Sequence, residues 1–303
     1  MKVARSGQVI PWLMVAPFVV LFSAFILYPM LRSLALSAYR SAGPAHSAFI
    51  GVENYRFLLS DPLFWTACLN TAMYTVLFVG LQLPAALGLA ITLDHPRLRG
   101  KQVLRAAFFC PHLVGAVFLG VVFWKLMGKD PASLANALWL PVAGLFSSHP
   151  QPLNWLGDPN LALGVVVAAA LWLSVGYSMI YLLAALQTVD RELYEAAAID
   201  GAGPWARFRH ITLPGVAPTL LFLVLVNTIG ALQVFELPYV LQGQTNGAGP
   251  ANSTLTVVGY LYQQGFETGN LGYACAIGWA LTIGIMVVSI AQLRVTRLDR
   301  DPT

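Results

Sequence analysis

The chain has 303 residues, of which 57% are hydrophobic and only 10% are charged, and its formal net charge is +4. Soluble domains carry about 25% charged residues, so this composition excludes an ordinary soluble protein and indicates a chain that crosses a membrane several times. The small positive charge does not indicate a nucleic-acid partner, and its distribution along the chain carries more information than its size.

Six runs of the sequence contain no Asp, Glu, Lys or Arg and are long enough, or nearly long enough, to cross a bilayer. A spanning helix needs about 20 mostly apolar residues. The sequence therefore predicts an all-α integral membrane protein with one transmembrane domain over residues 1–303. The expected spans are 10–31, 67–93, 106–126, 161–186, 215–236 and 270–293. Pro111 interrupts the third run, but proline is tolerated in a span whose neighbours satisfy the freed backbone groups.

The cations are distributed unequally between the two sides that six spans define. One side carries twelve: Lys2, Arg5, Arg97, Arg99, Lys101, Arg105, Arg191, Arg207, Arg209, Arg294, Arg297 and Arg300. The other side carries five: Arg32, Arg40, Arg56, Lys125 and Lys129. Positively charged residues concentrate on the cytoplasmic side of membrane proteins, so both termini are expected in the cytoplasm.

A short hydrophilic segment, residues 190–214, separates the fourth and fifth spans. Asp190 is a candidate N-cap, and the ten residues from Arg191 to Asp200 contain neither proline nor glycine. They predict a helix roughly 15 Å long. Gly201 suits the left-handed position after a helix end, and Pro204 suits the first turn of a second helix. The segment is therefore expected to form two short helices joined by a turn on the cytoplasmic side.

Seven residues of this segment fit the spacing EAA---G---------I-LP: Glu195, Ala196, Ala197, Gly201, Ile211, Leu213 and Pro214. This pattern resembles the EAA loop of membrane subunits in binding-protein-dependent ABC importers. The flanking stretches LYEAAAIDGAGPW and FELPYVL are similar to the carbohydrate branch, which includes maltose, multiple-sugar and glycerol-phosphate permeases. The one departure is Asp190, where the family often carries proline, and either residue can begin a helix.

The resemblance implies a type I ABC importer permease fold and a role for the segment as the coupling helix, which docks in a cleft of a separate ATPase subunit. The residues expected to couple the chain to that ATPase are Glu195, Ala196, Ala197, Asp200, Gly201, Ala202, Ile211, Leu213 and Pro214. The small alanine side chains allow close approach, and Glu195 could pair with a basic group of the partner. A helix that only closes the bundle is the alternative.

The resemblance also implies the partners of the chain. They are a second, related permease that completes a heterodimer, two copies of an ABC ATPase subunit, an extracytoplasmic substrate-binding protein and the lipid bilayer, with no nucleic acid. The expected location is the cytoplasmic, or inner, membrane of a bacterium or archaeon.

The chain itself is not expected to be an enzyme. It contains no G-x-x-x-x-G-K-[ST] loop to cradle a nucleotide phosphate, so ATP and magnesium would bind the partner ATPase. Its cysteines and histidines show no metal-ligand spacing, and we expect neither a metal site nor a cofactor in this chain.

Polar residues in the fifth run are candidates for the substrate path. Asn227, Gln233 and Glu236 lie among apolar residues, and Tyr239 follows. Polar and ionisable groups at membrane depth are costly and usually face a cavity or a partner. Asn227 and Gln233 are six positions apart, so they share a helical face only if Gly230 distorts the helix. Alternatively, Glu236 lies at the outer interface, just beyond the hydrocarbon.

The transported solute is expected to be a carbohydrate delivered by the binding protein. A glycerol-3-phosphate or phosphodiester importer is the related alternative, because its permeases share EAAAIDGAGP-like text. The sequence places no Lys or Arg deep in a span, which favours a neutral sugar. An ATP-independent secondary transporter or channel is the alternative of another class, and it would leave the EAA segment without a role.

Overall fold

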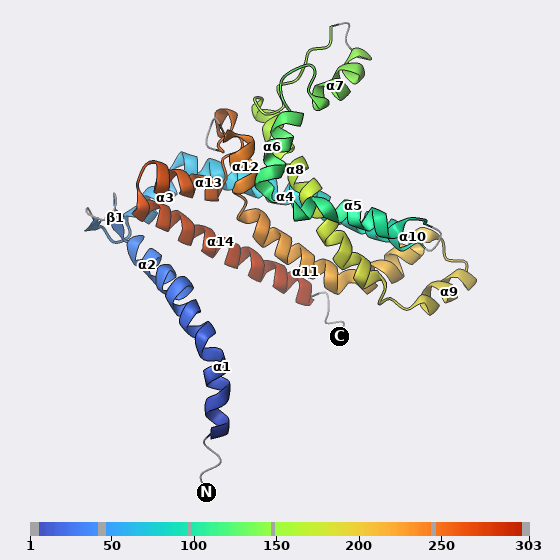
Figure 1. Cartoon of the computed structure of the whole chain (residues 1–303), viewed down its shortest axis with the longest axis horizontal. Helices are drawn as coiled ribbons and strands as arrows, with labels where there is room; N and C mark the ends of the chain where they lie inside the picture. The colour runs from blue at the N-terminus through green and yellow to red at the C-terminus, as the bar shows by residue number, and fades with distance from the viewer. Residues whose placement is uncertain (1–5, 42–46, 96–97, 147–148, 244–246, 299–303) are drawn as a thin grey trace. The chain divides into compact units, whose positions relative to one another are not determined.

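The computed structural model describes residues 6–41, 47–95, 98–146, 149–243 and 247–298, and within them it is predominantly helical (Figure 1). The all-α prediction is confirmed. The α-helices are α1 (Ser6–Phe22), α2 (Tyr28–Leu36), α3 (Glu53–Ser60), α4 (Pro62–Asp94), α5 (Lys101–Leu113), α6 (Ala116–Leu126), α7 (Leu134–Gly144), α8 (Pro159–Leu186), α9 (Arg191–Ile199), α10 (Pro204–Arg207), α11 (Leu213–Leu232), α12 (Glu236–Leu241), α13 (Val257–Tyr262) and α14 (Leu271–Leu298). Shorter π- or 3-10-helical turns are η1 (Ser23–Leu27), η2 (Phe208–Thr212), η4 (Pro250–Asn252) and η5 (Gln263–Glu267), and the strands are β1 (Tyr39–Ser41) and β2 (Ser47–Phe49).

The chain separates into two compact units. One unit consists of Met1–Asp61 with Leu261–Ile283, and the other of Pro62–Tyr260 with Gly284–Thr303. In the first unit, β1 and β2 form an antiparallel hairpin that pairs Tyr39 with Phe49. The hydroxyl of Tyr273 in α14 donates to the buried Asp61 carboxylate at 2.6 Å, which ties α14 to the end of α3.

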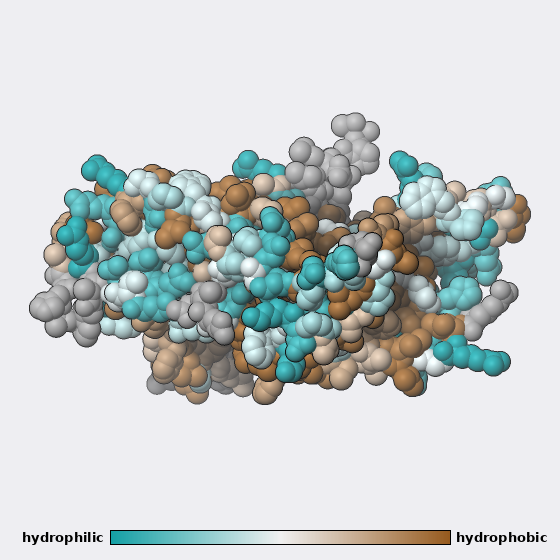
Figure 2. All heavy atoms as spheres, turned by 90° about the horizontal axis from the view of Figure 1, so that it is seen from above, coloured by the Kyte–Doolittle hydropathy of each residue, from teal (hydrophilic) through white to brown (hydrophobic). Residues whose placement is uncertain are grey.

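The first span presents its apolar side chains to the surroundings. Within residues 13–36 no side chain is buried, and Phe18 and Phe25 are 67% and 75% exposed. Figure 2 shows hydrophobic residues exposed among hydrophilic ones on one face of the molecule. An apolar helix without protein neighbours would be unfavourable in water, so this exposure fits a helix that contacts lipid or another subunit.

The core of the second unit lies between α4, α8 and α11. Leu87, Met179 and Leu223 belong to one buried cluster of these helices. Phe78, Phe123 and Leu237 belong to a second cluster, which adds α6 and α12. The three long helices therefore form the frame on which the shorter ones pack.

Among the residues that the structure describes, five stretches of helix are long and apolar enough to cross a membrane: Leu13–Leu36, Pro62–Asp94, Pro159–Leu186, Pro204–Leu232 and Leu271–Arg294. The third expected span, 106–126, is not one helix. Instead α5 and α6 meet at an angle of 98°, and counting this bent pair gives up to six spans. The break lies at Val114, whose backbone is extended, rather than at Pro111, which is accommodated in the last turn of α5.

A close approach of α5 to α8 explains part of this geometry. Gly176 of α8 is buried, and a Cβ built on it would overlap the backbone carbonyl of Phe108 in α5. On the other side of the break, a Cβ on Gly120 of α6 would lie only 2.7 Å from a methyl carbon of Val240 in α12. Each half of the bent pair therefore packs on a different neighbour through a glycine.

Two cations at the start of α5 cap the C-terminal end of α4. Lys101 donates from Nζ to the carbonyl of Asp94 at 3.1 Å, and Arg105 donates from Nη2 to the carbonyl of Leu93 at 3.2 Å. Cations stabilise the C-terminal end of a helix because its last carbonyls lack helical partners. Others that were counted for the orientation, Lys2, Arg5, Arg97 and Arg300, lie outside the described residues.

Asn136 organises the long connection between α6 and α8. Its side chain is fully buried and donates from Nδ2 to the carbonyls of Gly128, Asp130 and Leu153 at 3.1–3.2 Å. Its Oδ1 accepts from the backbone N–H of Leu153 at 2.9 Å and from the indole N–H of Trp155 at 3.0 Å. One amide thus joins the start of this connection to its end.

We expect Asn136→Ala to lower the stability of this connection by about 2–4 kcal/mol. The partly buried N–H donors of Leu153 and Trp155 would lose their acceptor, and each unsatisfied group costs about 1–3 kcal/mol when it is buried. Asn160→Ala, which removes an exposed amide near the start of α8, is the matched control. Limited proteolysis of the purified complex should cut residues 128–158 faster in Asn136→Ala only. Equal cleavage rates in the two variants would contradict the role assigned to Asn136.

Candidate functional site: the segment between α8 and α11

Residues 190–214 join the C-terminal end of α8 to the start of α11 (Figure 1). The Asp190 carboxylate caps α9 by accepting from the backbone N–H of Glu192 at 3.0 Å. The helix then runs from Arg191 to Ile199, with Asp200 as its C-cap. The local signals in the sequence thus predict this helix to within one residue, because N-cap and breaker residues act through the neighbouring backbone.

The turn after α9 closes on Gly201, which is left-handed with φ of +76°. Its N–H donates to the carbonyl of Ala198 at 3.2 Å, and the N–H of Ala202 donates to the carbonyl of Ala197 at 2.8 Å. This pair of bonds is the Schellman arrangement, which satisfies the last carbonyls of a helix and favours glycine at the left-handed position. The conformation of the turn is therefore fixed by its own backbone.

Side chains that the sequence analysis did not select brace the segment. Arg207 donates from Nε to the carbonyl of Ala202 at 2.7 Å, which links α10 to the turn. The hydroxyls of Tyr194 and the buried Thr212 lie 3.0 Å apart, which links α9 to η2. The two short helices are therefore held in one arrangement, although neither buries a residue of its own.

The predicted coupling residues divide into two groups. Glu195, Ala196, Asp200 and Gly201 are exposed, and Ala197 and Ala202 are partly buried, so these residues form the accessible surface of the helix and turn. Ile211 and Leu213 are partly buried, and Leu213 packs against the buried cluster of α4, α8 and α11. Pro214 is exposed in the first turn of α11. The first group is accessible to a partner, whereas Leu213 anchors the segment to the frame.

Large apolar side chains are also exposed here. Ile199 is 87% exposed, Trp205 is 71% exposed and Leu193 is 53% exposed. The ring of Trp205 stacks on that of Phe208 at 5.4 Å, so it is held in place. Large apolar side chains exposed on a hydrophilic segment are typical of a surface that binds another protein. The spacing signature gave no indication of Ile199 or Trp205, because exposure depends on the folded arrangement.

The candidate path residues lie in two places. Asn227 of α11 is partly buried and donates to the carbonyl of Leu223 at 2.8 Å and to the Ser178 hydroxyl at 3.4 Å. Gln82 of α4 is fully buried and donates to the same hydroxyl at 2.8 Å. Gln82 and Ser178 were not selected from the sequence, although a polar group inside an apolar run is the signal that would have pointed to Gln82.

The other candidates follow the end of α11. Gln233 is its exposed C-cap, Glu236 is exposed at the start of α12, and the ring of Tyr239 lies 5.1 Å from that of Phe235. Gly230 leaves α11 continuous, so Gln233 lies about 9 Å further along the helix than Asn227. Asn227 therefore belongs to the interior of the bundle, whereas the other three belong to the bend between α11 and α12.

A row of aromatic rings crosses α5, α8 and α11. His112 lies 4.7 Å from Tyr177, Tyr177 lies 4.9 Å from Tyr181, and Tyr181 lies 6.4 Å from Phe222. The hydroxyl of Tyr177 donates to that of Tyr181 at 3.3 Å, and Tyr181 and Phe222 are 41% and 50% exposed. This row could not be predicted from the sequence, because its rings come from three separate helices.

Comparison with known protein families shows to which family this chain belongs. The family of binding-protein-dependent transport system inner membrane components matches residues 83–298, which include the whole of segment 190–214. The chain belongs to this family. The resemblance derived from the spacing of Glu195, Gly201 and Pro214 is thereby confirmed.

Individual relatives of this permease are permease proteins of sugar transport systems. The arabinooligosaccharides transport system permease protein AraP of Bacillus subtilis (strain 168) is 38% identical over 96% of this chain and 90% of its own length. The lactose transport system permease protein LacF of Rhizobium radiobacter is 37% identical over 97% of this chain and 96% of its own length. These relatives confirm the prediction that the chain is a transport subunit and not an enzyme.

A solved structure has the same fold. It is the bacterial alginate ABC transporter in complex with an alginate pentasaccharide-bound periplasmic protein, and one of its chains superposes with a TM-score of 0.83 at 20% identity, over 96% of this permease and 95% of that chain. The fold of an ABC importer permease is thus confirmed for this chain.

Proposed function

We propose that this permease takes up a carbohydrate, delivered by a substrate-binding protein, through an importer driven by a separate ATPase. The observation that carries the proposal is the surface of α9 and its turn, where Ile199 and Trp205 are exposed on a backbone that is fixed by capping. A partner that closes around this surface could move it as one body, and α8 and α11 would transmit that movement into the bundle.

Relatives named for arabinooligosaccharides and lactose support a carbohydrate as the solute and favour it over the phosphodiester alternative. Membership in the importer family likewise favours an ATP-driven permease over a self-sufficient secondary transporter or channel. We further propose a heterodimer with a second permease, two ATPase subunits on the cytoplasmic side, and cytoplasmic termini in a bacterial or archaeal inner membrane.

We propose that the path of the solute follows Asn227, Gln233, Glu236 and Tyr239 along α11 and α12. The row of exposed aromatic rings at Tyr181 and Phe222 adds an apolar wall of the kind that ligand sites commonly use. Hydroxyl groups such as that of Tyr177 would supply hydrogen bonds for a neutral polyol.

A pull-down of the tagged chain in mild detergent from its native host tests the partners. The proposal expects an ABC ATPase and a second permease to co-purify, with ATP hydrolysis that responds to a substrate-loaded binding protein. A chain that purifies alone, from membranes in which uptake is intact, would contradict it.

A further inference from the structure

The connection between α6 and α8 contains no Asp, Glu, Lys or Arg over residues 131–157. Soluble domains carry about 25% charged residues, so this composition is unusual for a loop surrounded by water. The apolar helix α7 lies within the connection, and Figure 1 shows it beyond the end of α6. Its 11 residues extend over roughly 16 Å, whereas a spanning helix needs about 20 residues. The helix is therefore too short to cross a membrane and too apolar for a solvated loop.

The exposed face of α7 is apolar along its whole length. Leu134, Leu138, Val142 and Leu145 follow one another at positions i, i+4, i+8 and i+11, which places them on one side of the helix. All four are exposed, Leu138 by 67% and Leu145 by 80%. These four residues, here called the apolar stripe, form a continuous strip without a polar side chain.

The side of α7 that packs on protein carries its polar group. Asn136 is fully buried and donates to the carbonyls of Gly128 and Leu153. The ring of Trp139 packs edge-on against that of Trp155 at 6.2 Å. A helix on the surface of a soluble protein has the reverse arrangement, with its apolar face inward and its polar face outward. The arrangement in α7 suits an apolar surrounding.

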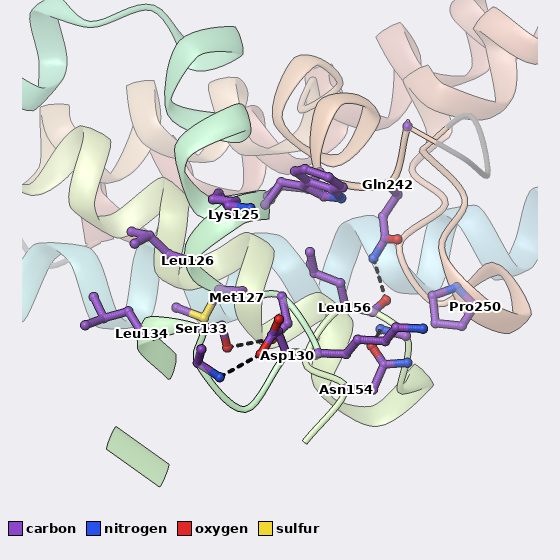
Figure 3. Close-up of a pocket in the computed structure, with 17 residues that line it drawn as sticks. Lys125, Leu126, Met127, Asp130, Ser133, Leu134, Asn154, Leu156, Gln242 and Pro250 are labelled. Carbon is purple, nitrogen blue, oxygen red and sulfur yellow. Dashed lines mark hydrogen bonds between the residues drawn. The ribbon is translucent and has the colours of Figure 1, made fainter. Parts of the chain in front are cut away.

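The start of α7 is tied to the end of α6, which belongs to the bent pair that can form one span. Phe118 of α6 is exposed, and the helix ends near Trp124 and Lys125, residue types that anchor a span at the boundary of lipid and water. Ser133, the N-cap of α7, donates to the carbonyl of Gly128 at 2.7 Å. Figure 3 shows Lys125 and Ser133 on the walls of one pocket of about 770 Å³. The first turn of α7 therefore lies next to the anchoring residues of α6.

We propose that α7 lies in the boundary of the bilayer, with the apolar stripe immersed in the acyl chains of the leaflet opposite the coupling segment. The leaflet follows from chain order, because α7 precedes the N-terminal end of α8 and α9 follows its C-terminal end. The inference needs only the membrane location of the family, so it depends neither on the solute nor on the ATPase.

The composition of the stripe favours lipid over a protein partner. Protein interfaces are enriched in Tyr, Trp and Arg and contain about one hydrogen bond per 100–200 Å². The stripe contains only Leu and Val and offers no side-chain donor or acceptor. Lipid acyl chains require neither.

Collisions of a nitroxide spin label with oxygen, which concentrates in hydrocarbon, and with a water-soluble nickel chelate distinguish lipid, water and protein. The label is attached to Leu138→Cys in a chain that carries Cys68→Ala, Cys110→Ala and Cys275→Ala. This chain, with the subunits that co-purify with it, is reconstituted in vesicles of phosphatidylethanolamine and phosphatidylglycerol. We expect frequent collisions with oxygen, rare collisions with nickel, and a label about 5–10 Å below the lipid phosphates.

Lys129→Cys in the same background is the matched control, because Lys129 is an exposed residue of the same connection outside the stripe. Its label should collide with nickel more often and lie at the phosphates or above them. If Leu138→Cys fails to assemble, Val142→Cys tests the same stripe and should give the same depth.

Two results would overturn the proposal. Collisions with nickel that are as frequent at Leu138 as at Lys129 would show that water covers the stripe. Rare collisions with both reagents at Leu138 would show that another protein surface covers it.

Discussion

A permease carrying Gly201→Val is expected to insert and fold but to lose ATP-dependent uptake by at least about tenfold. The left-handed conformation costs a residue with a Cβ about 1–2 kcal/mol, so the turn should leave its native geometry. Gly201 has φ of +76°, a conformation that a β-branched residue avoids. The bonds from Gly201 and Ala202 to α9 depend on that conformation, so the angle between α9 and α10 should change. Uptake into cells and recovery of the ATPase with the tagged chain measure the effect.

Gly203→Val is the control for this substitution. A Cβ on either glycine meets no atom within 4 Å, so the two variants add the same bulk to equally open space. Gly203 has φ of −70° and ψ of 169°, which valine adopts readily. Wild-type uptake by Gly201→Val, or an equal loss in both variants, would show that the left-handed turn is not what couples the segment to its partner.

The second large effect is expected at the crossing of α5 and α8. Gly176→Ala should destabilise the permease by about 3 kcal/mol, the upper part of the range for overpacked cores, because the new methyl group would meet the backbone carbonyl of Phe108 rather than a side chain that can turn away. The thermal midpoint and the yield of monodisperse complex in detergent should both fall.

Gly164→Ala provides the comparison on the same helix. A Cβ at Gly164 meets no atom within 4 Å, so this change should be neutral or should stabilise α8 by up to about 1 kcal/mol. If Gly176→Ala is as stable as Gly164→Ala, the two helices do not cross at the distance that the structure shows.

The coupling segment is the part that could be predicted most fully from the sequence. Asp190, Gly201 and Pro204 act on the backbone within a few residues, so the helix ends follow from local chemistry. The exposure of Ile199 and Trp205 could not be predicted, because burial depends on which surfaces the rest of the fold leaves uncovered. The hydrogen bonds between Tyr194 and Thr212 and between Arg207 and Ala202 could not be predicted for the same reason.

The bundle was predicted in outline. Runs of apolar residues located the long helices, because bilayer thickness sets their length. The 98° bend between α5 and α6 was not predicted, since it depends on the separate packing of Gly176 and Gly120 on distant helices. The bond from Gln82 to Ser178 joins residues 96 positions apart, and no local pattern contains such a pairing.

The central claim is tested most directly by uptake of labelled neutral oligosaccharides into proteoliposomes that contain this permease, its co-purifying partners and the binding protein. The account predicts uptake only when ATP, the ATPase subunits and the substrate-loaded binding protein are all present, with loss of uptake in Gly201→Val. Uptake by this chain reconstituted alone, without ATP, would contradict the account.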